Sequence, residues 1–114
     1  MVIYNKSFEE RFKESASVLQ KYPSKVPVIV YRSSTSLDIP DLKKNKFLVP
    51  RDFTVGQFIY LIRSNIKLPS HKSMFIFVNN SLPTTSTLIS TLYQNYKDND
   101  GFLYMVYTGE STFG

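Results

Sequence analysis

The chain has 114 residues, 42% of them hydrophobic, no cysteine and a formal net charge of +5, a length that corresponds to one domain. The absence of cysteine excludes disulfides, thiolate metal sites and a cysteine nucleophile. No apolar run reaches the roughly 20 residues that cross a bilayer. The first ten residues lack the basic and apolar segments of a signal peptide, so we expect a cytoplasmic protein.

The positive charge is concentrated in the N-terminal part of the chain. Residues 1–72 carry 13 basic and 6 acidic side chains, whereas residues 73–114 carry 1 and 3. Such an excess favours acidic partners such as tubulin tails, anionic lipid or nucleic acid. The alternative is an ordinary solvated surface with surplus lysine. Most aromatic residues fall at core spacing rather than in an exposed stacking row, so we expect no specific nucleic-acid binding.

The first predicted element is a helix over residues 8–22. Ser7 and Glu10 have the spacing of a capping box, and Pro23 ends the stretch. The helical spacing places a set of small and apolar side chains on one face, as in an amphipathic helix: Phe8, Phe12, Ala16, Leu19 and Tyr22.

Two strands are predicted next. Residues 25–32, "KVPVIVYR", are an apolar and β-branched run that is typical of a buried strand. Residues 33–45 form a polar loop, and residues 46–51, "KFLVPR", form a short second strand. Pro50 is tolerated only at the end of a strand or on a sheet edge.

A second helix is predicted in residues 54–69, "TVGQFIYLIRSNIKLP". Thr54 and Gln57 form another capping box ahead of the apolar face. Helical spacing places five apolar side chains on that face: Val55, Phe58, Leu61, Ile62 and Ile66.

The remaining elements are a strand, a short helix and a strand. Residues 74–83, "MFIFVNNSLP", read as a strand that ends at Asn79 and Asn80, a residue type that tolerates left-handed turn geometry. Residues 85–101 fit a short helix that stops near Gly101, and residues 102–108, "FLYMVYT", form the last strand. The side chains of this short helix that are expected to face inward are Leu88, Leu92 and Tyr96.

The order of these elements predicts an α+β fold. Two strands joined by a loop, a packing helix and two more strands form one mixed sheet with a helix across it. This is a ubiquitin-like β-grasp fold, a four-stranded mixed sheet with packing helices, preceded here by an N-terminal helical extension. Parallel pairing of the first and last strands follows from that fold and not from periodicity.

Enzyme chemistry has little support in the sequence. His71 is the only histidine, and no third group or oxyanion donor marks a Ser-His-acid site beside Ser70 and Ser73. One histidine without cysteine cannot make a usual zinc site. The four glycines are isolated, so no glycine-rich phosphate loop exists. The sequence therefore predicts no enzyme, metal or cofactor site.

Several consecutive blocks resemble a known family. Residues 21–30 ("KYPSKVPVIV"), 46–63 ("KFLVPRDFTVGQFIYLIR"), 75–94 ("FIFVNNSLPTTSTLISTLYQ") and 101–114 ("GFLYMVYTGESTFG") are similar, in this order, to the autophagy ubiquitin-like modifiers of the GABARAP and light chain 3 type. Residues 32–45 ("RSSTSLDIPDLKKN") resemble the family less closely than the segments on either side. Val18 and Phe53 stand where relatives often carry isoleucine or leucine.

The resemblance implies that the C-terminal Gly114 is a conjugation end. In this family E1-like and E2-like enzymes activate the glycine with ATP and join it to phosphatidylethanolamine on autophagosomal membrane. A deconjugating cysteine protease releases the protein from the lipid. Glycine has no side chain to hinder attack on its carboxylate. The expected organisation is an extension over residues 1–24, a β-grasp domain over 25–110 and a conjugation tail over 111–114. A chain cut at Gly114 is the alternative for this terminus.

The resemblance also implies binding of aromatic-x-x-aliphatic peptides of cargo receptors and adaptors. An extended peptide would add to the edge of the strand "KFLVP". The positions that match the aromatic pocket are Glu14, Val18, Pro27, Ile29, Lys46, Leu48 and Phe102. Those that match the aliphatic pocket are Phe47, Val49, Pro50, Phe53, Phe58 and Leu61. Lys25, Lys46 and Arg63 are expected to attract acidic residues of the peptide.

Each of these residues also has a plain structural interpretation. The apolar side chains are alternatively core residues, and the lysines alternatively belong to a solvated face. Two other functions remain alternatives: a β-grasp adaptor that binds peptides or cytoskeleton without conjugation, and a relative that is joined to lysine rather than to lipid. We expect a monomer that is cytoplasmic, and on autophagosome membrane when lipidated, with tubulin as a further partner.

Overall fold

The structure is a computed structural model that describes residues 5–110. Its elements occur in the predicted order of helix, strand, strand, helix, strand, helix and strand. They are α1 (Phe8–Lys21), β1 (Lys25–Arg32), β2 (Lys46–Pro50), α2 (Val55–Asn65), β3 (Phe75–Phe77), α3 (Ile89–Tyr96) and β4 (Leu103–Thr108).

The four strands form one mixed sheet in the order β2-β1-β4-β3. β1 pairs with β2 antiparallel and with β4 parallel, and β3 pairs with β4 antiparallel. The inferred parallel pairing of the first and last strands is therefore confirmed. β2 is an edge strand and Pro50 is its last residue, which satisfies both conditions under which proline is tolerated.

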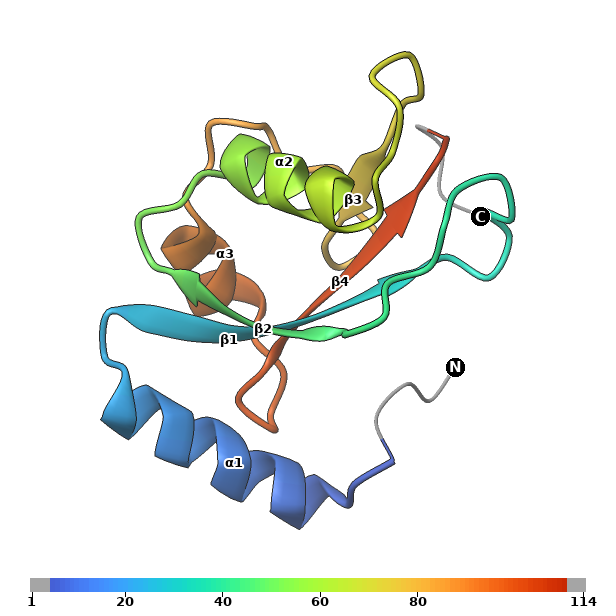
Figure 1. Ribbon diagram of the computed structural model, residues 1–114. Coiled ribbons are helices and arrows are strands. Elements are labelled where there is room, and N and C mark those ends of the chain that lie inside the picture. Colours follow the sequence, from blue (N-terminus) through green and yellow to red (C-terminus); the bar gives the residue numbers. More distant parts are fainter. Residues whose placement is uncertain (1–4, 111–114) are drawn as a thin grey trace.

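The helices lie on both faces of the sheet (Figure 1). α2 and α3 cover one face and α1 lies against the other. The main hydrophobic core fills the space beneath α2 and α3, where apolar burial drives folding. Its members with an exposed fraction of 0% are Val26, Val28, Val30, Phe58, Ile62, Ile89, Leu103 and Tyr107.

The predicted face of α1 is wrong. Phe8, Phe12 and Tyr22 are exposed by 50%, 51% and 43% of their surface, and Ala16 is exposed too. Only Leu19 of that set packs against the core. The capping box of Ser7 with Glu10 is confirmed. The helix instead turns a largely polar stripe toward the sheet: Arg11, Glu14, Ser15 and Val18, of which Ser15 is fully buried.

The two other helices confirm most of their predictions. α2 has the predicted capping box, and Val55, Phe58, Ile62 and Ile66 are buried. α3 begins one residue after Leu88, which is 41% exposed, and Tyr96 is 44% exposed at its end. The prediction that these two side chains face inward is therefore wrong. The buried side chains of α3 are Ile89, Leu92 and Tyr93.

The turns require backbone conformations that few residues adopt. Asn79 and Asn80 follow β3 with positive φ angles of 52° and 61°, as predicted for asparagine at such a turn. Gly101 has φ of 88°, two residues before the start of β4. Within residues 5–110, no helix is both long enough and apolar enough to span a bilayer.

Candidate peptide-binding site

The outer edge of β2 carries backbone groups that β1 does not use. Hydrogen bonds join Val30 N to Asn45 O (2.8 Å) and Arg51 N to Ser24 O (3.0 Å) at the two ends of the ladder. Bonded and non-bonded pairs alternate in an antiparallel ladder. The register therefore directs the N–H and C=O groups of Lys46 and Leu48 away from β1, toward the open side of the sheet.

A cavity of about 440 Å³ lies between α1 and β2, and we call it the α1-side cavity. Its lining residues are Glu14, Val18, Pro27, Lys44, Lys46, Phe47, Leu48 and Phe102. Six of the seven positions predicted for the aromatic pocket are thus brought together. Ile29 of β1 is not among them, because its side chain is only 2% exposed.

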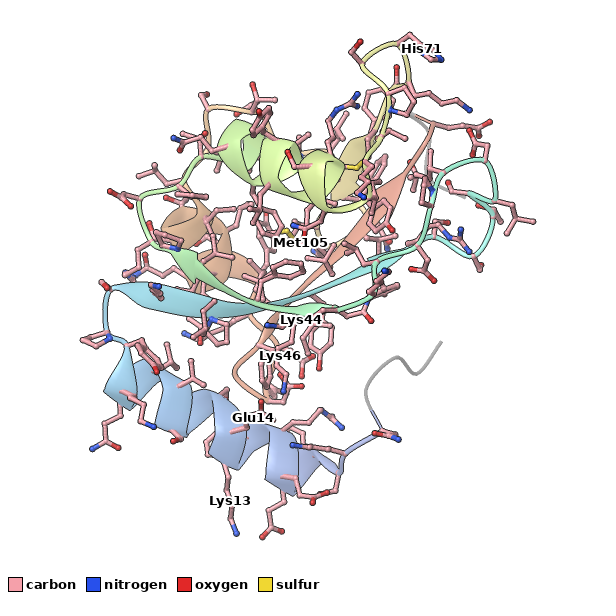
Figure 2. The ribbon with its side chains drawn as sticks, viewed as in Figure 1. Lys13, Glu14, Lys44, Lys46, His71 and Met105 are labelled. Atoms are coloured by element: carbon pink, nitrogen blue, oxygen red, sulfur yellow. The ribbon has the colours of Figure 1, made fainter. Side chains whose placement is uncertain are left out.

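Charged side chains border the α1-side cavity. Glu14 of α1 forms ion pairs with Lys6, at 3.3 Å, and with Lys46 of β2. Glu14, Lys44 and Lys46 lie together between α1 and the sheet, whereas Lys13 points away from it (Figure 2). Lys44 lines the cavity as a second cation beside Lys46. The border of the cavity therefore attracts acidic groups.

The two other predicted rim cations lie at different places. Lys25 begins β1 and is half-buried. Arg63 lies near the end of α2, donates to Pro69 O at 2.9 Å, and lines a separate cavity of about 430 Å³ with Lys67. The three cations Lys25, Lys46 and Arg63 therefore do not form a single cluster.

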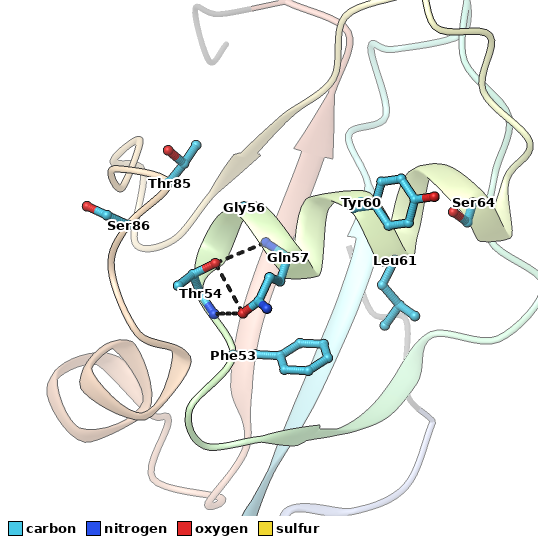
Figure 3. A pocket seen from close by; sticks show the side chains of 9 residues that line it. All are labelled: Phe53, Thr54, Gly56, Gln57, Tyr60, Leu61, Ser64, Thr85 and Ser86. Carbon is cyan, nitrogen blue, oxygen red and sulfur yellow. Dashed lines mark hydrogen bonds between the residues drawn. The ribbon is translucent and has the colours of Figure 1, made fainter.

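A larger cavity of about 690 Å³ lies along α2, and we call it the α2-side cavity. Its lining residues are Phe53, Thr54, Gly56, Gln57, Tyr60, Leu61, Ser64, Thr85 and Ser86. Figure 3 shows Phe53 and Leu61 on one side of α2 and Thr85 and Ser86 on the loop at its other side. The capping box of Thr54 with Gln57 holds the first turn of α2 in place, through Gln57 N to Thr54 Oγ1 at 3.1 Å.

The predicted aliphatic set divides between this cavity and the core. Phe53 and Leu61 line the α2-side cavity. Val49 and Phe58 are 1% and 0% exposed, so they are core residues. Phe47 packs edge-to-face on Phe58 with ring centroids 5.9 Å apart and also borders the α1-side cavity. Pro50, the sixth member, is half-buried at the end of β2.

β4 is the last strand of the sheet and ends at Thr108. Gly109 N donates to Ser36 Oγ at 3.1 Å, so the loop between β1 and β2 holds the first residue after the strand. Gly114 and the rest of the predicted conjugation tail lie outside the described residues. His71 is exposed in the loop between α2 and β3, and no three His, Asp or Glu side chains of residues 5–110 are placed to hold a metal ion.

Sequence reasoning missed Lys44 and most residues of the α2-side cavity. Lys44 lies in the polar loop, where no periodicity marks a side chain that turns toward a site. The lining residues Gly56, Gln57, Tyr60 and Ser64 occupy the outward positions of α2. Their helical spacing was the available signal, because they form the complement of the predicted apolar face.

Comparisons with known proteins agree with the fold. Residues 10–114 match the family described as "Autophagy protein Atg8 ubiquitin like". Autophagy-related protein 8a of Arabidopsis thaliana is 53% identical over 106 residues, which cover 93% of this chain and 86% of that protein. Autophagy-related protein 8 of Candida albicans is 56% identical over 107 residues, 94% of this chain and 78% of that one.

A solved structure is similar over almost the whole chain. The crystal structure of Trypanosoma brucei ATG8 superposes with a TM-score of 0.89 at 40% sequence identity, covering 96% of this chain and 94% of that one. The expected ubiquitin-like fold is thereby confirmed. The family match covers well over half of the sequence. The chain belongs to the Atg8 family of autophagy-related ubiquitin-like proteins.

Proposed function

We propose that this protein is a non-enzymatic modifier that is joined through Gly114 to phosphatidylethanolamine and binds short peptides of cargo receptors and adaptors. In the conjugation step, the Gly114 carboxylate is activated with ATP, passes through enzyme thioesters and forms an amide with the lipid amine. Two acyl chains then anchor the protein, where one chain would bind only marginally. The partners are the conjugating enzymes, a deconjugating cysteine protease and autophagosomal membrane.

One observation carries the peptide-binding part: an open strand edge that borders the α1-side cavity, with the α2-side cavity on the other face of the sheet. β2 residues line the first cavity, whereas α2 and Phe53, three residues after β2, line the second, and α1 and α2 cover opposite faces of the sheet (Figure 1). Side chains of an added strand alternate between the two faces. Residues i and i+3 therefore point to opposite faces, about 10 Å apart along the strand. A peptide with an aromatic residue and, three positions later, an aliphatic one fits this arrangement.

The cavities differ in a way that supports the assignment of the two anchors. The α1-side cavity has basic side chains at its border, which favour acidic residues beside the aromatic anchor. The α2-side cavity is lined by apolar, hydroxyl and amide groups without a charged side chain. We assign the aromatic anchor to the α1-side cavity and the aliphatic anchor to the Phe53 and Leu61 end of the α2-side cavity.

Reconstitution tests the conjugation step. The protein is incubated with activating and transferring enzymes, ATP and aminophospholipid liposomes, and its intact mass is measured. We expect a lipid adduct with the wild type and none with Gly114→Ala, because the added methyl group obstructs the reactive carboxylate. Peptide affinity serves as the control and should stay the same in the variant. A normal adduct on Gly114→Ala would contradict the role of the glycine, and no adduct on either protein would favour the adaptor function.

A leucine pair tests the peptide site. Leu48 is 38% exposed at the α1-side cavity, whereas Leu37 is 77% exposed in the loop between β1 and β2. We expect Leu48→Ala to weaken binding of an aromatic-x-x-leucine peptide by about tenfold, which corresponds to about 1.4 kcal/mol. Leu37→Ala is the matched control and should bind as the wild type does. Calorimetric titration measures both, and equal affinities would remove Leu48 from the site.

A further inference from the structure

Asp100 is a buried carboxylate that the proposed function does not use. Its side chain is 0% exposed, and three donors surround it. Arg11 Nε of α1 donates to Oδ2 at 2.9 Å, Tyr104 OH donates to Oδ2 at 2.5 Å, and Phe102 N donates to Oδ1 at 2.9 Å. Such charge-assisted bonds are short and strong, and their partners are therefore held in defined positions.

A second contact joins α1 to Asp100 one turn further along the helix. Ser15 is 2% exposed, and its hydroxyl donates to Asp100 O at 2.6 Å. The helix approaches so closely that a Cβ added to Gly101 would lie 2.1 Å from Ser15 Oγ. We call Arg11, Ser15, Asp100 and Tyr104 the polar latch.

Apolar packing alone does not explain how α1 is held. Phe8 and Phe12 of the helix are exposed and stack on each other, with ring centroids 6.2 Å apart. Leu19 is the side chain of α1 that packs against the core cluster. The latch therefore supplies the specific contacts that fix the position of the helix on the sheet.

The latch joins the two walls of the α1-side cavity without lining it. One wall is α1, through Glu14 and Val18, and the other includes Phe102. Asp100 holds both walls, since its carboxylate accepts from Arg11 on α1 and from the backbone of Phe102. We propose that the latch residues are positioning residues that set the affinity of this cavity for an aromatic side chain.

This inference rests on the proposed peptide binding and makes a quantitative claim. A protein whose binding-competent state is partly populated binds with its affinity reduced by that fraction. If loss of Arg11 leaves α1 docked about one tenth of the time, the apparent Kd rises about tenfold. The hydrogen bond to Asp100 raises the pKa of Arg11, and burial raises that of Tyr104, so both groups keep donating at neutral pH.

The test compares Arg11→Met with Lys13→Met. Both variants remove one positive charge from α1, but Lys13 belongs to an exposed pair with Glu9 at 3.7 Å and lies away from the latch. The probe is a synthetic peptide with a tryptophan, a leucine three positions later and no acidic residue. The protein contains no tryptophan, so the emission of the complex reports only the peptide.

We expect Arg11→Met to raise the Kd about tenfold and to reduce the blue shift of tryptophan emission at saturating protein. Lys13→Met should behave as the wild type. A second peptide with alanine in place of tryptophan should bind the wild type and Arg11→Met equally, because it places no side chain in the cavity. Unchanged Kd and emission in Arg11→Met, or equal losses for both peptides, would overturn the positioning role.

Thermal melting identifies a variant that fails to fold, and Ser15→Ala then replaces Arg11→Met under the same criteria. Ser15→Ala removes the bonds of the Ser15 hydroxyl to Asp100 O and Phe12 O and leaves the ion pair of Arg11 with Asp100 intact. Failure of the wild type to bind either peptide would overturn the proposed peptide binding and this inference with it. Binding by the wild type together with unaffected latch variants would overturn the inference alone.

Discussion

Gly101 shows how strongly one position depends on its surroundings. Its φ of 88° lies in the region that L side chains rarely adopt, and Ser15 occupies the space that a side chain would need. "DNDG" indicates a turn by its composition alone. Nothing in those four letters indicates that Ser15 of α1, far earlier in the chain, packs against the glycine, because that contact depends on the assembled fold.

We expect Gly101→Ala to lower the free energy of unfolding by more than the roughly 1 kcal/mol of an ordinary glycine substitution, since backbone strain and a steric clash add. Urea unfolding measures the loss. Ser15→Gly alone also lowers stability, because it removes the bond to Asp100 O. We expect the double variant Gly101→Ala with Ser15→Gly to lose less than the sum of the two single losses, because the clash is relieved while the strained φ remains. Losses that simply add would show that the close approach of α1 is unimportant.

The buried Tyr107 makes the folding stability of the protein depend on pH in the alkaline range. The side chain is 0% exposed and its hydroxyl donates to Pro40 O at 2.8 Å. Burial raises the pKa of Tyr107 to about 12, against about 10 for an unfolded tyrosine. Below pH 10 the phenol is protonated in both states. Between about pH 10 and 12 the unfolded chain loses this proton and the folded chain keeps it, so stability falls as pH rises.

Urea unfolding at a series of alkaline pH values measures this decline. We expect Tyr107→Phe to be less stable at neutral pH, because it loses the hydrogen bond to Pro40, and to decline less steeply above about pH 10. The control is Tyr60→Phe at a site that is 74% exposed, which should keep the wild-type slope. A Tyr107→Phe slope equal to that of the wild type would assign the alkaline loss to other groups.

At the scale of elements, β2 has the most direct functional consequence. Its Lys46 and Leu48 backbone groups point away from β1, so a peptide that adds to the sheet must pair with them. We expect N-methylation of the peptide amide that donates to β2 to weaken binding about tenfold or more, because one main-chain hydrogen bond is lost and a methyl group is inserted. Isothermal titration of a set of singly methylated peptides measures this.

The pattern of losses provides the control for that experiment. Amides of an added strand alternate between the sheet and solvent. Methylation at the solvent-facing positions should therefore leave affinity unchanged. Positions where methylation weakens binding and positions where it has no effect should alternate along the peptide. A uniform loss at all positions, or none, would exclude strand addition at β2.

The helices show which local signals were sufficient. The capping boxes of Ser7 with Glu10 and Thr54 with Gln57 were predicted and are present, because capping depends on residues three apart in one chain segment. The prediction of which face of α1 is buried was wrong, because it assumed that the periodic apolar side chains face the protein. α1 is held through Ser15 and Arg11, and polar docking leaves no periodic signal in the apolar residues.

For the whole molecule, element order was sufficient to predict the sheet. Few arrangements connect these strands without crossing loops, so the order of helices and strands restricts the topology strongly. The cavities were less predictable. Local reasoning could not separate Val49 and Phe58, which lie in the core, from Leu61, which reaches a cavity, because all three are apolar and differ only in what packs around them.

The parallel pair of β1 and β4 has a mechanical consequence. β4 is a central strand, and it pairs with β1 in register from Val28↔Leu103 to Arg32↔Tyr107. Because the two strands are parallel, the N-terminal end of β1 and the C-terminal end of β4 lie at opposite ends of the ladder, so pulling these two points apart loads the ladder in shear. All hydrogen bonds of the ladder then share the load and must break together, whereas peeling would break them in succession.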